Sequence, residues 1–200
     1  MPLLLWFQKL KPRDMNEVQH INDIAVKLDK LHAAVGAEYN KTLQEICELR
    51  TFKPLPNVKN IFWVENTKDE DLPRLIEAAK KAVEFGNTVY IMPNPSTTRS
   101  MDFIFVRKGI YKDYDLKTVM GQSSVSNRLN ESKGQSKRVL LNMATNYKPR
   151  LLAKQIIRHF ETNEYAVEVL IYKGKRQIPI NRKDSELNDF EYRFIKIWLK

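Results

Sequence analysis

The sequence of 200 residues predicts an α/β domain that is preceded by a helical extension. Three observations lead to this fold class. Apolar residues recur at steps of three and four from residue 15 to residue 49, which is the period of an amphipathic helix. From residue 65 onward, helical segments alternate with short apolar segments that are typical of buried strands. Two of those strands flank Gly109 and are predicted to form a β-hairpin.

The first quarter of the chain is predicted to be one long helix or a helical hairpin broken at Gly36. The segment "FKPLPNVKN" ends the helical pattern with two prolines, and the apolar run from Ile61 to Val64 is expected to be a short strand. We therefore place a boundary near residue 64. It separates an N-terminal helical extension (1–64) from the main domain (65–183), which a C-terminal helical tail (184–200) follows.

The main domain is expected to begin with a helix over residues 68–85. Thr67 and Glu70 have the spacing of a capping box, Pro73 suits a first helical turn, and Gly86 suits the position after the last turn. The strands expected after this helix cover 88–93, 101–108, 111–119, 138–143, 165–172 and 177–180. Further helical segments are expected between 120 and 136, over 149–162, and over 185–200.

Composition excludes several classes of protein and of site. No apolar run reaches the roughly 18 residues of a membrane span, and the leading "MPLLLWF" is too short and wrongly flanked for a signal peptide, so we expect a soluble protein acting in the cytoplasm. Cys47 has no intrachain partner for a disulfide. The three histidines stand on different helical segments, which argues against zinc and against histidine-based nucleophilic catalysis.

Positive charge is concentrated in the second half of the chain. The net charge is +10, and residues 128–183 contain thirteen Lys or Arg against four Glu. Such a basic segment favours a polyanionic partner, although it is also compatible with an ordinary solvated surface. Within it, Lys137 and Arg138 are expected to contact a phosphate backbone.

The predicted hairpin carries a group of charged residues on strands that otherwise look buried. In an extended strand alternate side chains share a face, so Asp115 and Lys117 lie on one face and Leu116 on the other. Asp102 opens the preceding strand, and the hairpin brings it close to Asp115 or Lys117. Asp113 shares their face but is expected to be solvated. The alternative is that all these charges simply line a solvated strand.

Two converging carboxylates at such a place supply the hard oxygen ligands that Mg²⁺ prefers. A nearby lysine can position or help to deprotonate a water molecule bound to the metal.

The order of Glu77, Asp102 and "DLK" at 115–117 resembles the motif of the PD-(D/E)xK nuclease superfamily, with Met101 in place of the usual proline. More closely, it is similar to the C-terminal tRNase domain of CdiA-type toxins of contact-dependent growth inhibition, a domain also found attached to phage head proteins. The resemblance covers residue 65 to about residue 183. It implies a restriction-endonuclease-like αβββαβ core with a mixed sheet.

The resemblance also implies roles for individual residues. Glu77 would be the acid of the helix, although Lys80 and Lys81 offer it ordinary ion pairs instead. Asp102, Asp115 and the Leu116 carbonyl would hold Mg²⁺ or Mn²⁺, and Lys117 would be the catalytic lysine. Thr118 and Gln135 occupy places where related toxins often carry polar residues, although a turn or cap role is an open alternative.

Ser123, Ser124 and Arg128 are further candidates for contacting a phosphate, because they stand at the start of a predicted helix. Ordinary helix capping would explain the serines equally well.

The function predicted by this resemblance is metal-dependent endonuclease activity on RNA, with tRNA favoured and DNA open. A toxin-type role would add an immunity protein as a partner. The first alternative is a non-catalytic nucleic-acid-binding or structural module in which the acids are incidental. The second is an interaction protein of a phage or mobile element that dimerises through residues 15–49.

Overall fold

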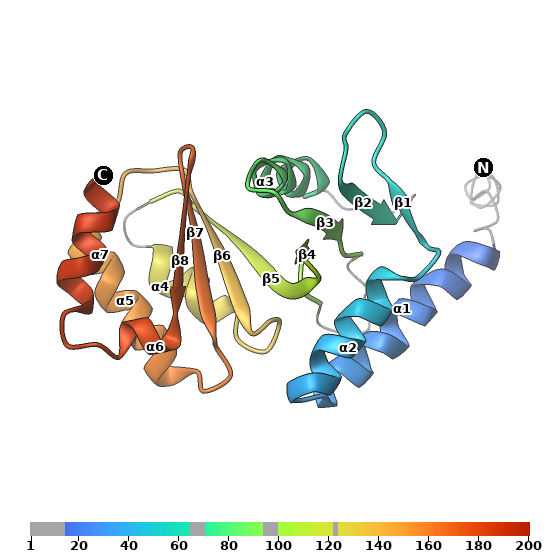
Figure 1. Ribbon diagram of the computed structural model, residues 1–200, viewed down its shortest axis with the longest axis horizontal. Coiled ribbons are helices and arrows are strands. Elements are labelled where there is room, and N and C mark those ends of the chain that lie inside the picture. Colours follow the sequence, from blue (N-terminus) through green and yellow to red (C-terminus); the bar gives the residue numbers. More distant parts are fainter. Residues whose placement is uncertain (1–14, 65–70, 94–99, 122–123) are drawn as a thin grey trace, which may run out of the picture.

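The computed structural model describes residues 15–64, 71–93, 100–121 and 124–200 (Figure 1). Its helices are α1 (Met15–Ala33), α2 (Gly36–Cys47), α3 (Leu72–Glu84), α4 (Ser124–Glu131), α5 (Pro149–Thr162), α6 (Arg182–Ser185) and α7 (Phe190–Leu199). Its strands are β1 (Phe52–Pro54), β2 (Ile61–Val64), β3 (Thr88–Ile91), β4 (Phe103–Arg107), β5 (Ile110–Val119), β6 (Arg138–Met143), β7 (Glu168–Lys173) and β8 (Arg176–Asn181).

The strands form one mixed sheet whose spatial order is the order of the chain, from β1 to β8. The antiparallel pairs are β1–β2, β3–β4, β4–β5 and β7–β8, whose strands follow one another without an intervening helix. The pairs β2–β3, β5–β6 and β6–β7 are parallel, and a helix connects the two strands of each. The predicted α/β class and mixed sheet are confirmed, whereas the finer restriction-endonuclease-like core stays a prediction.

Helices cover both faces of this sheet. On one face, here called the α3 face, α3 packs against apolar residues of β3 to β7. On the other, the α5 face, α4, α5 and α7 cover the β6–β8 end, and α1 and α2 cover the β1–β4 end. Figure 1 shows these two helical groups at opposite ends of the molecule, with β5 between them. Strand β5 is therefore the place where two separate cores meet.

The N-terminal helices form the hairpin that was one of the two predicted options. Gly36 begins α2 with a φ of +57°, a backbone conformation that glycine adopts without steric cost. The apolar stripe of both helices packs against the α5 face, where Leu28 and Leu43 are buried with Ile104 of β4. The sheet continues across residue 64, because β2 pairs with β3.

The remaining elements follow the sequence pattern with small changes at their ends. Helix α3 has Pro73 in its first turn as expected, while the predicted capping box of Thr67 and Glu70 lies outside the described residues. At the C-terminus, Phe194 and Trp198 of α7 are buried in the same core as α5. None of the helices in the described ranges is long and apolar enough to cross a membrane.

His159 on α5 gives a prediction about stability. It is 3% exposed, and neither ring nitrogen has a hydrogen-bond partner among the described residues. Burial, and to a smaller extent the charges of Lys133 and Arg182, lower the pKa of His159 to about 4. The folded protein thus favours the neutral ring. The contribution of His159 to the unfolding free energy is therefore complete above about pH 6.5 and is lost as the pH falls towards 4.

We expect His159→Phe to remove this part of the acid sensitivity. Between pH 7 and pH 4 the variant should lose about 2 kcal/mol less unfolding free energy than the parent, measured by urea denaturation. The exposed His32 on α1 provides the matched control, because His32→Phe should leave the pH dependence unchanged. Parallel pH profiles for the parent and His159→Phe would contradict the prediction.

Candidate metal centre at a fork in the sheet

Strand β5 changes its partner halfway along its length. Residues 110–114 pair with β4, whereas residues 115–119 pair with β6. The last ladder contact to the β4 side is the hydrogen bond from the Asp102 amide to the Tyr114 carbonyl (3.0 Å). Beyond that point the sheet opens into a fork between β4 and β5, and Asp115 is the first residue inside it.

The carboxylates of Asp102 and Asp115 meet at this fork. The register of the hairpin, in which Phe103 lies opposite Tyr114, places Asp102 opposite Asp115 on the α5 face. Asp102 uses its carboxylate to extend the ladder: its Oδ2 accepts a hydrogen bond from the Leu116 amide at 2.6 Å. The predicted approach of Asp102 to the Asp-x-Lys strand is therefore confirmed.

Lys117 completes the cluster from the same strand and the same face. Its Nζ donates to Asp115 Oδ1 at 3.0 Å and lies 2.9 Å from Oδ2. The Asp115 side chain is 1% exposed, whereas that of Lys117 is 14% exposed. The lysine thus reaches the solvent side of the cluster and the aspartate forms its floor. As expected, Tyr114 and Leu116 are buried on the α3 face.

Electrostatics at the fork disfavour two ionised carboxylates. Burial and the charge of Asp102 raise the pKa of Asp115 to about 7, against the opposing effect of Lys117. Burial also raises the pKa of Asp102, although its hydrogen bond with the Leu116 amide and the charge of Lys117 act in the opposite direction. One lysine does not offset both carboxylates when they are ionised. The pair then carries an excess negative charge that a bound cation would neutralise.

The side chains at the fork fit a divalent cation. Asp115 Oδ2 is buried without a hydrogen-bond partner among the described residues, and the ammonium of Lys117 is its single close cation there. The Leu116 amide points towards the β4 side, and because the N–H and C=O of a strand residue face the same neighbour, the Leu116 carbonyl also faces the fork. Two carboxylates and a carbonyl form a hard oxygen donor set.

Glu77 does not join these ligands. It lies on α3 with a side chain that is 69% exposed, and it pairs with Lys80 at 2.8 Å. Within the described ranges, no group of three or more acidic, histidine or cysteine side chains is placed to hold a metal. Glu77 therefore forms an exposed ion pair along a helix, which is the alternative that the sequence left open.

Asp113 corrects an expectation. It was expected to be solvated, but it is 0% exposed, so this interpretation was wrong. Its Oδ2 accepts hydrogen bonds from Ser136 Oγ (2.5 Å) and the Lys137 amide (2.9 Å), and its Oδ1 pairs with Arg138 at 2.7 Å. Residues 110–114 of β5 do not pair with β6, and these polar contacts join the two strands where the ladder is missing.

Arg138 links this carboxylate to a second one that the sequence interpretation missed. Its Nε lies 3.5 Å from Glu168, a buried residue of β7 that also binds Lys112 (2.7 Å) and the Tyr114 hydroxyl (2.9 Å). Arg138 is thus held between two buried acids, which does not support its predicted contact with a substrate phosphate. A lone glutamate in the apolar strand "YAVEVLIY" was the available signal.

The other predicted substrate-binding residues lie around the fork without converging on it. Thr118 faces the α3 face beside Asn142, whose side chain accepts from Lys81 at 3.0 Å. Lys137 places its Nζ 3.6 Å above the ring of Tyr39 on α2.

The candidates on and after α4 have local partners. Ser124 donates to the Gly121 carbonyl (2.8 Å), Arg128 pairs with Glu131 (2.8 Å), and Gln135 donates to the Glu131 carbonyl (3.1 Å). These contacts are the capping and turn roles that the sequence left open. Ser123 lies outside the described residues.

The chain has little similarity to known proteins. No family model matches the chain, and no curated protein matches it. Among solved structures, the chain is similar to the CdiA-CT/CdiI toxin and immunity complex from Burkholderia pseudomallei. The similarity covers 66% of this chain and 96% of that chain, at 15% sequence identity and a TM-score of 0.41. A similarity of this size shows neither a shared fold nor a shared activity.

Proposed function

We propose that the protein is a metal-dependent phosphodiesterase that cleaves nucleic acid at the fork between β4 and β5. The observation that carries the proposal is the pair of opposed carboxylates, of which Asp115 is buried and Asp102 is half-buried, with Lys117 close to both oxygens of Asp115. A purely structural ion pair would not need a second carboxylate beside it, because that carboxylate raises the cost of burying both charges. The resemblance of the Asp102 and "DLK" motif to PD-(D/E)xK nucleases supports the same function.

In this proposal the residues of the fork have separate tasks. Asp102, Asp115 and the Leu116 carbonyl hold Mg²⁺ or Mn²⁺, which when bound polarises a phosphoryl oxygen and offsets developing negative charge. Asp102 also fixes the strand by accepting from the Leu116 amide. Lys117, whose side chain is 14% exposed against 1% for Asp115, orients the attacking water and is itself held in place by Asp115.

RNA is the favoured substrate class, with tRNA first, because of the resemblance to CdiA-type tRNase domains. The basic segment 128–183 supports a polyanionic substrate of either kind. A toxin-type effector role and an immunity protein as partner belong to the same proposal.

Incubation of the purified protein with total tRNA and with plasmid DNA, in Mg²⁺, Mn²⁺ or EDTA, tests this function. We expect cleavage with either metal and none in EDTA. Lys117→Met should slow cleavage by about 10²- to 10⁴-fold, because it removes the group that orients the water. It should still melt at a higher temperature when Mn²⁺ is added, because both carboxylates remain.

Glu84→Gln is the matched control, since Glu84 is an exposed acid on α3 that should not affect either readout. Absence of metal-dependent cleavage in the parent, with both substrates, would contradict the proposed function.

A further inference from the structure

Helix α5 carries a row of three cations on its outer face. Arg150, Lys154 and Arg158 are spaced four residues apart, which places them on one side of the helix at steps of about 6 Å. All three are exposed. The opposite side of α5 packs on the α5 face of the sheet through Leu152 and Ile156. The row therefore lies on the same side of the sheet as the Asp102–Asp115 pair.

This row differs from several cations on other helices, which have ion-pair partners. Arg74, Lys80, Arg128 and Arg193 each pair with a carboxylate three or four residues away on the same helix or at its cap. No carboxylate in the described part of the chain lies within ion-pair distance of Arg150, Lys154 or Arg158. Like charges at this spacing destabilise a helix slightly, so folding alone does not favour the arrangement.

The row continues towards the fork through the turn between α4 and β6. Lys133 donates to the Thr162 hydroxyl at 3.2 Å, and Thr162 stands four residues beyond Arg158. The far end of the same turn holds Asp113 through Ser136, and Asp113 is two residues from Asp115 on the same face of β5. Lys133 therefore extends the row from α5 to the turn that contacts β5, the strand that carries the site.

We propose that Arg150, Lys154, Arg158 and Lys133, here called the basic track, bind the backbone of the nucleic-acid substrate and guide it to the fork. The inference rests on the proposed function and adds the surface that holds the substrate. An even row of unpaired cations suits a partner whose negative charges repeat at regular intervals, as phosphates do along a strand. An acidic protein surface, with irregular charges, has no need of this regularity.

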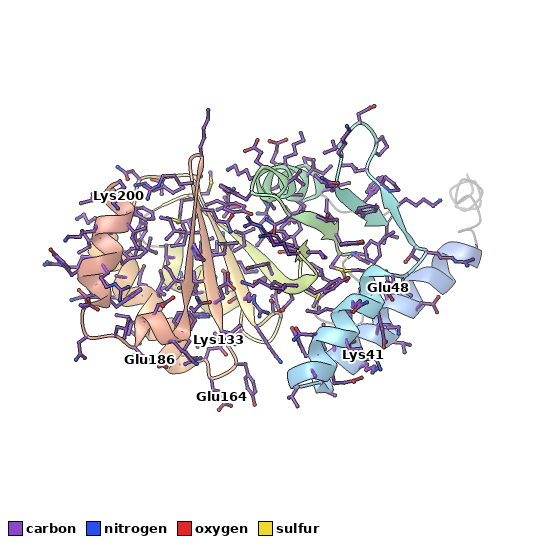
Figure 2. All side chains as sticks on the ribbon, viewed as in Figure 1. Lys41, Glu48, Lys133, Glu164, Glu186 and Lys200 are labelled. Carbon is purple, nitrogen blue, oxygen red and sulfur yellow. The ribbon has the colours of Figure 1, made fainter. Side chains whose placement is uncertain are left out.

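Binding in the absence of cleavage tests the track. Fluorescence anisotropy with a labelled single-stranded RNA of about 20 nucleotides, in EDTA, gives the affinity at several salt concentrations. The test variant combines Arg150→Gln, Lys154→Gln and Arg158→Gln. The control removes the same charge elsewhere with Lys41→Gln, Lys59→Gln and Arg107→Gln, which are exposed on α2, the β1–β2 turn and β4. Figure 2 shows Lys41 at the opposite end of the molecule from α5.

We expect the test variant to flatten the slope of log K against log salt by about 2, which corresponds to three lost phosphate contacts on a single strand. Its affinity at about 100 mM salt should fall tenfold or more, while the control changes both quantities little. A melting temperature equal to that of the parent would show that the variant is folded.

Equal losses of RNA affinity in the test and control variants would overturn the proposed role of the basic track, because they would reflect net charge alone. Undiminished RNA binding by the test variant would also overturn it, and would assign the row to another partner such as an acidic protein. Cleavage by the parent is scored separately with metal. Cleavage by a protein whose RNA binding does not depend on the track would contradict the track alone. RNA binding through the track without metal-dependent cleavage would contradict the proposed function alone.

Discussion

Replacing Asp115 with asparagine is expected to stabilise the fold at neutral pH while it abolishes metal-dependent cleavage. The buried carboxylate of Asp115 and the half-buried carboxylate of Asp102 face each other at the fork, and Lys117 offsets only part of their charge. Asparagine keeps the shape and removes one charge, which relieves the repulsion. It also removes a ligand of the proposed metal, so cleavage should fall by about 10³-fold or more.

The direction of this change in stability follows from the pKa of Asp115. The pKa of Asp115 is raised to about 7 in the folded state, against about 4 in an unfolded chain. Below about pH 4 the side chain is protonated in both states and carries no penalty. As the pH rises through this window the folded state resists ionisation, so stability falls, and above about pH 7 the whole penalty is present.

Urea denaturation in EDTA should therefore find Asp115→Asn more stable than the parent by about 2 to 3 kcal/mol at pH 8 and nearly equal to it at pH 4. Glu84→Gln, an exposed acid on α3, should differ little from the parent at both values. A variant that is less stable than the parent at pH 8 would show that the aspartate is a structural ion-pair partner and not a strained ligand.

Removing Arg138 is expected to cause the largest loss of stability among single charge changes in this chain. Its guanidinium lies between Asp113, at 2.7 Å, and Glu168, at 3.5 Å, and both acids are buried. Arg138→Ala leaves two carboxylates short of a cation in the interior. Breaking a buried pair in this way costs about 3 to 5 kcal/mol.

Guanidinium chloride unfolding measures this loss against Arg128→Ala, in which the arginine leaves an exposed pair with Glu131. The control should lose less than about 1 kcal/mol. Arg138→Met keeps much of the side-chain volume and should lose nearly as much as Arg138→Ala, which separates lost charge from lost packing. Similar, small losses in Arg138 and Arg128 variants would contradict the proposed network.

Most of the fold follows from periodicity that the sequence displays openly. Residues 15–49 show a helical period, Gly36 marks the break, and Gly109 with its φ of +75° marks the hairpin turn. The joining of residues 52–64 to the sheet could not be predicted in the same way. It depends on β2 pairing in parallel with β3 across a helix, and parallel register is set by tertiary packing, not by a local turn.

The site was predictable where strand geometry alone decides the outcome. Period two placed Asp115 and Lys117 on one face, and hairpin register brought Asp102 to them. The burial of Asp113 was not predictable, because the strand changes partner after Tyr114 and the acid is buried by residues 136–138, which do not form a ladder with β5 at that level. A strand read in isolation does not show where its partners diverge.

The position of Glu77 shows the same limit for a helix. Its helical spacing to Lys80 and Lys81 was visible, but the orientation of α3 on the sheet depends on Leu75, Ala78 and Ala82, which turn Glu77 to solvent. The sequence was compatible both with an acid at the metal site and with an exposed ion pair. Packing of the apolar side of the helix decided between them.

The most direct measurement is the cleavage rate of tRNA by the parent and by Asp115→Asn, purified side by side, with saturating Mn²⁺ and with EDTA. The proposed metal site at the fork predicts cleavage by the parent only when metal is present. It also predicts that Asp115→Asn, folded and at least as stable as the parent, cleaves more slowly by about 10³-fold or more. Equal cleavage by both proteins, or cleavage by the parent that persists in EDTA, would contradict the assignment of Asp102, Asp115 and Lys117 as a metal-dependent phosphodiesterase site.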